Sequence, residues 1–557
     1  MPRHHQAAVE SRCRQVARAC RPTAWHQPPT EAGRPAGGVF SPRPRFSLVR
    51  SLPVCAVLAV GWLFSPYPAA GATAGKFTIE TVDKATQRPV AARMHLLNHK
   101  KRPVLPPRTV SWKDHFVFDG SITLELAPGT YSFVIERGPE YRLRFGHFTI
   151  ERGATGQQTI ELERFTEMKR EGWWSGDLHI HRRPEDIELL MRAEDLHIAP
   201  VITWWNNQDL WETQPRPEEL LIATDDQRFY QLLAGEDERE GGALLYFNLD
   251  QPLAIRGLTR EYPSGAQFLA EARRSRAAHI DIEKPFWWDM PMWIATGQAD
   301  SIGLANNHLW RGGGLFTEAW GKPREKVRYP DPQGNGRWSQ DIYYHLLNCG
   351  IRIPPSAGSA SGVLSNPVGY NRVYVHCGQQ LTWDAWWAGL RAGQVVVTNG
   401  PLLRPRVNGE LPGHVFSAPA GETVALDIAL QVSFREPVDY LEIVQNGKVV
   451  HEVRLADYAK QQGRLPPVLF QESGWLLIRA VSNNDQTYQF GSTGPYYVEI
   501  GQQPRISRTS AQFFADWVRE RATRIQLADP AQREEVIRYH RQARDFWQDV
   551  LDRANTP

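Results

Sequence analysis

The sequence has little cysteine, and most of it lies near the start of the chain. Only 5 of 557 residues are cysteine, and Cys13, Cys20 and Cys55 precede residue 73. Cys349 and Cys377 remain and could pair in an oxidising compartment, but two cysteines exclude a disulfide framework as the basis of the fold. The lack of a cysteine motif also argues against a heme or redox protein.

Acidic residues and long apolar runs are scarce in the first part of the chain. Residues 1–50 contain only Glu10 and Glu31 beside nine arginines. The apolar run 52–64 is shorter than the roughly 20 residues of a membrane span. A basic region, a short apolar run and small residues at 70–72 are typical of a secretory signal. We interpret residues 1–74 as a leader and expect export to the periplasm or the exterior, with an uncleaved anchor as the alternative.

Positive charge is concentrated in this leader. The sequence has a net charge of +3, residues 1–72 contribute +7, and the remainder therefore carries about −4. This distribution does not indicate a nucleic-acid partner. No stable membrane span is expected after cleavage of the signal, and the oligomeric state is left open. The length and the 41% hydrophobic content predict three or four globular domains.

Two regions show the alternation of apolar residues that is typical of strands. Tyr131, Phe133 and Ile135 alternate within residues 76–166, where frequent Gly and Pro turns predict a β-sandwich. The segment LAPGTYSFVIERG resembles the transthyretin-like modules of secreted enzymes. Residues 401–505 alternate in the same way and predict a second sandwich. Residues 506–557 predict two amphipathic helices that pack on the body, with a dimerisation hairpin as the alternative.

Strand and helix signals alternate across residues 172–400. Repeated units of this kind predict a parallel sheet, most simply a barrel. The segment GWWSGDLHIHRR places His179 and His181 where a strand runs out into a loop. Residues two apart on a strand face the same side, so both imidazoles can approach one metal ion. A bare H-x-H on a solvated strand would explain the pair alone, but other candidates follow it.

Three further candidates lie near strand ends downstream. Glu236 follows a strand in LAGED, His279 lies within or at the end of the next strand, and His308 ends IGLANNH. Each residue alone fits a structural role, and Glu236 belongs to an acidic stretch that could be a solvated face. Five such residues in order favour a hydrolytic metal site, which needs ligands that converge from separate strands.

The order of these motifs resembles the PHP (polymerase and histidinol phosphatase) superfamily. More closely, GDLHIHR followed by GED is similar to its secreted CehA/McbA-type, carbaryl-hydrolase-like branch, over roughly residues 172–400. The resemblance implies a distorted (β/α)7 barrel with one to three Zn, Mn or Fe ions at the strand C-termini. It implies a first ion on His179, His181 and Glu236, and a second on Glu236, His279 and His308.

The chain departs from this family at two motifs. The family usually has T-D-H-N after the second strand, where this chain has TWWN at 203–206. It usually ends with G-S-D-x-H, where this chain has GSASG at 358–362. These changes remove a third-ion site and one ligand of the first ion. We therefore expect one or two divalent ions (Zn, Mn or Fe), because two His and one Glu still leave a position for water.

Other residues near these motifs have open roles. Asp177 either orients a ligand imidazole or caps a turn. Arg182 either binds an anionic substrate group or lies on the barrel rim. The loop from 354 to 374 offers Ser359, Asn366 and Arg372, which either bind a polar substrate or stabilise a turn-rich connector.

The sequence predicts a multidomain α/β plus all-β protein: a PHP-type barrel flanked by two β-sandwiches, with a C-terminal helical hairpin. The predicted function is an exported metal-dependent hydrolase of a small-molecule or glycan substrate, with Glu236 and His308 as catalytic residues. The bond is a phosphoester, a carbamate or a carboxylic ester. The alternative is an inactive envelope protein that binds a glycan or protein on a barrel without its metal.

Overall fold

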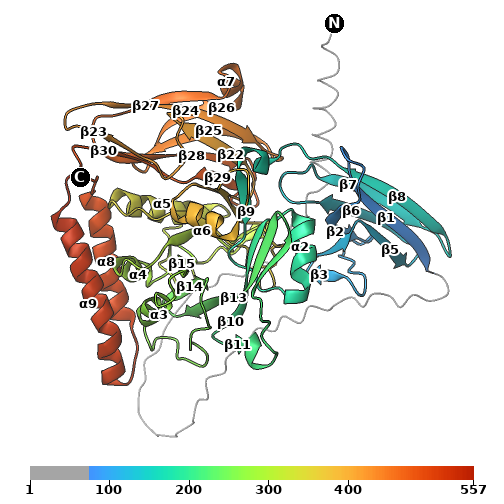
Figure 1. The fold of residues 1–557 in the computed structure, drawn as a ribbon, viewed down its shortest axis with the longest axis horizontal. Coiled ribbons are helices and arrows are strands. Elements are labelled where there is room, and N and C mark those ends of the chain that lie inside the picture. Colours follow the sequence, from blue (N-terminus) through green and yellow to red (C-terminus); the bar gives the residue numbers. More distant parts are fainter. Residues whose placement is uncertain (1–73) are drawn as a thin grey trace, which may run out of the picture. The chain divides into compact units, whose positions relative to one another are not determined.

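Residues 74–557 are described by a computed structural model of the protein, and they belong to one unit. The predicted leader lies outside the described residues except for Ala74. The prediction of a mixed α/β protein with several sheets is confirmed. Figure 1 shows the sheets and helices in chain order.

Two sheets form the first part of the described chain. One has the strand order β5-β1-β8 and the other β3-β4-β2-β6-β7. On β6, Tyr131, Phe133 and Ile135 are buried in a core with Phe148, as their alternation predicts. The strands are β1 (Gly75–Asp83), β2 (Ala91–Leu97), β3 (Val110–Trp112), β4 (His115–Asp119), β5 (Ser121–Leu126), β6 (Gly129–Glu136), β7 (Arg144–Ile150) and β8 (Thr155–Leu162).

Seven strands of the middle region pair in succession. β9, β10 and β13 are parallel, β14 is antiparallel to both β13 and β15, and β15, β16 and β19 are parallel again. The residues after β9 and β19 pair through Ile180 and Ser361, so the succession closes on itself. The strands are β9 (Trp173–Gly176), β10 (Ile198–Trp205), β13 (Arg228–Arg239), β14 (Gly242–Phe247), β15 (His279–Ile282), β16 (Ser301–Ala305) and β19 (Pro355–Ala357).

Helices and short strands connect these seven strands. Pro184 begins a short 3-10 turn that leads into α2, whose buried Ile187, Leu190 and Met191 share one face. The helices are α2 (Ile187–Glu194), α3 (Gly265–Ala272), α4 (Met290–Ala295), α5 (Gly334–Asn348) and α6 (Trp383–Arg391). The short strands are β11 (Gln208–Asp209), β12 (Leu221–Asp225), β17 (Leu309–Trp310) and β18 (Gly313–Gly314).

A glycine makes room for one of the unexpected tryptophans. Trp204 lies opposite Gly235 in the parallel pairing of β10 and β13. A Cβ atom on Gly235 would lie 2.1 Å from ring carbons of Trp204. Trp204 is therefore fully buried and stacks on Tyr246 in the core, and the next pair in register brings Trp205 opposite Glu236.

The C-terminal strands continue the middle sheet. β20 (Arg372–His376) pairs with β9 and β21 (Val395–Thr398), and β21 pairs with β29. A separate sheet has the order β22-β24-β27. Through β21 and β29, the middle sheet therefore extends past residue 401, where the second sandwich was predicted to begin. The strands and the one helix are β22 (Leu402–Val407), β23 (Val415–Ala418), β24 (Val424–Ser433), β25 (Val438–Gln445), β26 (Lys448–Arg454), α7 (Leu455–Lys460), β27 (Arg464–Phe470), β28 (Gly474–Ser482), β29 (Phe490–Thr493) and β30 (Tyr496–Ile500).

Two long helices end the chain and pack on the body. α8 (Arg508–Arg524) and α9 (Pro530–Asp552) contact each other, α4 and α5. Trp517 and Trp547 are buried in the same core as α4. Among the described residues, no helix combines the length and the apolar content that crossing a membrane requires.

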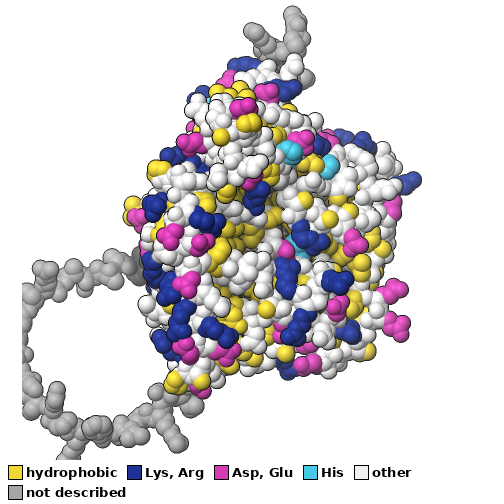
Figure 2. Space-filling model, turned by 60° about the vertical axis from the view of Figure 1, so that its left-hand side comes forward, with side chains coloured by type: hydrophobic (Ala, Val, Ile, Leu, Met, Phe, Trp, Pro, Cys, Tyr) yellow, Lys and Arg dark blue, Asp and Glu magenta, His cyan; other side chains and the backbone are white. Residues whose placement is uncertain are grey.

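One face of the molecule mixes charges of both signs (Figure 2), and the two described cysteines are unpaired. Figure 2 shows one face, on which Lys and Arg side chains are interspersed with acidic ones. Cys349 and Cys377 are both free, and burial raises the pKa of the Cys377 thiol to about 12.

Candidate metal centre

Asp177 fixes the loop that carries the two predicted histidine ligands. Its carboxylate accepts the backbone N–H groups of His179 at 3.0 Å, Ser359 at 3.0 Å and Gly369 at 2.7 Å. Of its two expected roles, the structure therefore shows the turn-stabilising one. Because one carboxylate holds the 177–181 segment and the 358–369 loop together, the backbone under both histidines is fixed.

His179, His181 and Glu236 converge on one point. His179 Nε2 lies 3.1 Å from His181 Nε2 and 3.3 Å from Glu236 Oε1, and His181 Nε2 lies 2.9 Å from Glu236 Oε2. All three side chains are buried. Their ligand atoms come from the end of β9 and from β13, which are neighbours of β10 on either side.

The spacing and charge of this group fit a divalent ion. Three ligands bound tetrahedrally at roughly 2.0–2.1 Å would stand about 3.3 Å apart, close to the three separations observed. Burial opposes protonation of both imidazoles, but the charges of Glu236 and Glu283 raise the pKa of His179 to about 10. Burial lowers the pKa of His181. The carboxylates of Glu236 and Glu283 both face His179, so a positive charge is favourable at this group.

Glu283 supports this group from behind, and sequence reasoning missed it. Its Oε1 lies 3.4 Å from His179 Nδ1. A carboxylate that faces Nδ1 favours the tautomer with its proton on Nδ1, which leaves the Nε2 lone pair free for a metal. Glu283 directly follows β15 and continues its alternation of His279 and Asp281 by one step. That alternation was the available signal.

His279 lies away from the converging group, contrary to the expectation that it ligates an ion. It begins β15 rather than ending it, and its Nε2 lies 2.8 Å from Ser301 Oγ. The Ser301 hydroxyl donates to Asp281 at 2.5 Å, so His279 Nε2 must carry the proton. Its ring packs 4.8 Å from that of Trp387. His279 is therefore a buried, hydrogen-bonded core residue.

His308 is buried next to the segment after Glu283 but does not join the three ligand atoms within 4.8 Å of one another. Its ring lies 5.3 Å from that of Phe286. Burial and the charge of Lys284 hold the pKa of His308 well below its usual range. His308 is therefore neutral and disfavours protonation, so it is not a source of a proton for the leaving group.

The four predicted substrate residues do not line a cavity with the three ligands. Arg182 donates to the carbonyl of Ser111 and lies over Trp112. Ser359 and Asn366 are buried and bond to backbone groups of their own loop or of Leu309. These hydrogen bonds stabilise the loop from 354 to 374, so the two side chains are not available to a ligand.

Arg372 belongs to a different cavity, of about 280 Å³. It donates to the carbonyls of Gly369 and Glu194. Arg93, Glu136, Arg311 and Arg435 line the same cavity. These residues come from three sequence regions, so the cavity lies where those regions meet.

One cavity is lined by Trp205, which also contacts the candidate centre, although none of the three ligands lines the cavity. The ring of Trp205 meets that of His181 edge-on at 5.1 Å. The cavity has a volume of about 320 Å³. Its walls combine aromatic, apolar, amide and charged side chains, namely Trp204, Trp205, Gln208, Asp209, Glu212, Arg216, Gln251, Pro252, Leu253, Ala254, Ile255 and Arg256.

Two groups of described residues could hold a metal ion, and the second is His95, Asp114 and His115. The hydrogen bonds of this second group place protons on ring nitrogens that an ion would need, which argues against a bound ion. Arg93 is a pure donor and bonds His95 Nε2 at 2.9 Å, so the Nδ1 that faces Asp114 at 3.2 Å carries the proton. His115 Nδ1 lies 2.9 Å from the same carboxylate. This group is satisfied by hydrogen bonds alone.

Replacing Glu283 by glutamine should weaken the binding of a divalent ion by about 10–100-fold, the usual cost of a lost outer partner of a ligand histidine. The substitution removes the charge that fixes the His179 proton. Competition against a chromogenic chelator would measure the affinity. Glu240→Gln, at an exposed pair with Arg260, is the matched control. Equal affinities in both variants would contradict the role of Glu283.

No family model matches this chain, and the search of curated proteins gives no match. Among solved structures, the chain is similar over short stretches to the Bacillus anthracis TIE protein, with 20% identity and a TM-score of 0.14. It is also similar to phospholipase PlaB from Legionella pneumophila, with 13% identity and a TM-score of 0.13. The matches cover 20% and 18% of this chain and 19% and 26% of those chains. Similarity this low carries no argument about fold or function.

Proposed function

We propose that this protein is an exported metal-dependent hydrolase of the PHP type, of the carbaryl-hydrolase-like branch, that cleaves an ester-like bond. The bond would be a phosphoester, a carbamate or a carboxylic ester. The observation that carries the proposal is the convergence of His179, His181 and Glu236, with Glu283 behind His179. The closed succession of seven strands supports a PHP-type barrel as the framework.

The three side chains would hold one ion and leave a position open. Two His and one Glu form a donor set of catalytic zinc sites, and Mn or Fe could bind as well. A bound ion would lower the pKa of a coordinated water and polarise the substrate oxygen. Trp205 shields one side of His181, and the cavity beyond it would receive a small-molecule or glycan substrate.

Proton transfer to the leaving group needs another residue, and Glu238 is the best placed. His308 is neutral, and Asp237 is held by Arg239 in two bonds of 2.7 Å. Arg182 faces the first domain. Glu238 is two residues beyond Glu236 on β13, so the two side chains lie on one face of the strand, and Glu238 is exposed to solvent. We assign Glu238 the role of general acid.

The test is hydrolysis by the chain after chelation and after return of Zn, Mn or Fe. We expect about one bound ion and metal-dependent cleavage of at least one class among aryl phosphoesters, carbamates and carboxylic esters. A folded chain that binds no ion and cleaves none would instead support the envelope binding protein.

A further inference from the structure

A lysine and a glutamate form a buried ion pair directly behind His179. Only 2% of the Lys284 side chain and 3% of the Glu283 side chain are exposed, and Lys284 Nζ contacts Glu283 Oε2. The other oxygen of Glu283 is the one near His179 Nδ1. Both residues follow β15, so the end of that strand aims a carboxylate and its counter-ion at the candidate metal centre.

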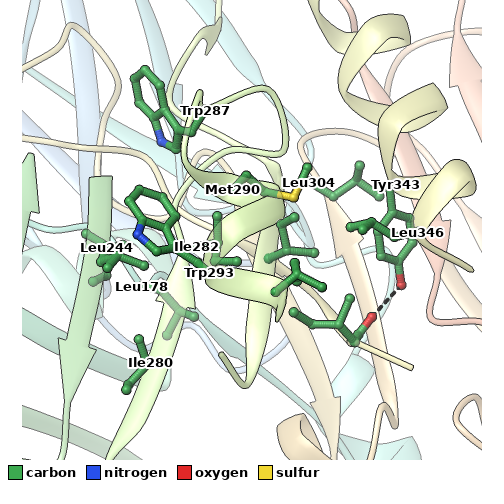
Figure 3. Close-up of a cluster of buried hydrophobic side chains, with 14 of the residues drawn as sticks. Leu178, Leu244, Ile280, Ile282, Trp287, Met290, Trp293, Leu304, Tyr343 and Leu346 are labelled. Atoms are coloured by element: carbon green, nitrogen blue, oxygen red, sulfur yellow. Dashed lines mark hydrogen bonds between the residues drawn. The ribbon is translucent and has the colours of Figure 1, made fainter. Parts of the chain in front are cut away.

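Trp287 encloses the pair. Its indole Nε1 donates to Glu283 Oε2 at 3.2 Å, and its ring lies 4.3 Å from Lys284 Nζ. Figure 3 shows Trp287 with Met290 and Trp293 among the buried side chains of this segment. The ammonium is thus held by a carboxylate and an aromatic face, an arrangement that stabilises a desolvated cation.

Charge around the centre explains why a cation lies here. Glu236 and Glu283 are both carboxylates buried close to His179. One divalent ion between the histidines would be liganded by Glu236 and would leave Glu283 as a second negative charge. An unpaired buried carboxylate is costly, and a pair is retained only where the partner is well placed. Lys284 is that partner.

Lys284 also lies beside a second set of potential metal donors. His308 is buried against Phe286, two residues beyond Lys284, and its Nδ1 has no hydrogen-bond partner within the described chain. Glu283 and His308 are both ordinary metal ligands. Without the ammonium, Glu283 and His308 would be a carboxylate and an imidazole without a nearby fixed cation, open to a second ion.

We propose that the ammonium of Lys284 takes the place of a second metal ion, so that this centre binds one divalent ion and uses a lysine as its fixed second cation. The inference rests on the proposed function, because it assumes the ion on His179, His181 and Glu236. Lys284 acts through Glu283 and is therefore a positioning residue. Its contact with Glu283 Oε2 leaves Oε1 facing His179 Nδ1.

The experiment is the number of ions bound per chain, measured by equilibrium dialysis against zinc or cobalt alone and by elemental analysis. We expect one equivalent for the wild-type chain and for Lys284→Arg, which keeps the charge. Lys284→Met should bind two equivalents. Lys284→Met combined with Glu283→Gln should return to one, because the second ion loses its carboxylate.

Lys322→Met is the matched control. Lys322 also pairs with a glutamate, Glu520, and lies over Trp288 and Trp517, but it lies outside the candidate centre. The Lys322→Met chain should bind one equivalent of the metal ion. Lys284→Gln replaces Lys284→Met if the latter does not fold, as judged by circular dichroism.

Two results would overturn the inference alone: two equivalents in the wild-type chain, or one equivalent in a folded Lys284→Met or Lys284→Gln chain while the wild type binds one ion and hydrolyses esters. A wild-type chain that binds no ion would overturn the inference together with the proposed function. Ion counting therefore separates the two failures, because it needs no substrate.

Discussion

Replacing His179 and His181 together by alanine should leave the chain without a bound ion and abolish metal-dependent hydrolysis. The two imidazoles supply two of the three ligand atoms that converge within 4.8 Å. Without the ion, the pKa of the attacking water returns from about 7 toward about 15.7, so the rate should fall by several orders of magnitude. Elemental analysis and ester hydrolysis by the same preparation would measure both losses.

The second histidine group provides the control for this experiment. His115→Gln alters the group in which hydrogen bonds satisfy both rings. It should leave the bound ion and the hydrolysis rate unchanged. The assignment of the centre would be wrong if His115→Gln lost the ion, or if the double alanine variant kept it.

Replacing Glu136 by alanine should cost roughly 3–5 kcal/mol of folding free energy, the usual penalty for removing one partner of a buried ion pair. Glu136 is 3% exposed and pairs with Arg93 at 3.0 Å, Arg311 at 2.6 Å and Arg435 at 3.6 Å. These arginines come from the first, middle and last regions of the chain. Truncation would remove the carboxylate that the three guanidinium groups share, and within the described chain only Arg93 and Arg435 would keep another acidic partner, Glu194 and Glu436.

Urea unfolding, followed by tryptophan fluorescence, would measure this loss. Glu163→Ala is the control, because Glu163 pairs with Lys84 at 2.9 Å on the exposed surface, where a salt bridge contributes little to stability. Burial opposes the charge of Glu136, but Arg93, Arg311 and Arg435 hold its pKa well below the ordinary 4.5. The contribution of Glu136 is thus complete above pH 4.5 and is lost only as the pH falls below that value. Equal losses in the two variants would contradict the prediction.

Local motifs in the sequence predict the three residues that converge at the candidate centre. His179 and His181 two apart after a strand, and Glu236 on a later strand, come together in the structure. The register explains why this works: Trp205 and Glu236 are direct neighbours across parallel strands. Alternation on single strands likewise predicts the buried faces of the first domain.

The sequence does not show at which residue β15 begins, and this start determines which of its side chains reach the candidate centre. We expected His279 within or at the end of the strand, but it is the first residue, and Glu283, four positions later on the same face, reaches His179. Arg372 shows a second limit. Its neighbours Arg93 and Arg435 lie far away in the sequence, so only the folded chain shows that they share a cavity.

The C-terminal helices brace the segment that carries Glu283 and Lys284. Trp547 of α9 donates to the carbonyl of Pro291 at 2.9 Å, and Arg521 of α8 bonds Asp289 at 2.7 Å. Chains are synthesised from the N-terminus, so every candidate ligand exists before either helix does. The brace is made after the ligands. We therefore expect stable loading with metal to await synthesis of α8 and α9, which separates synthesis of the ligands in time from their use.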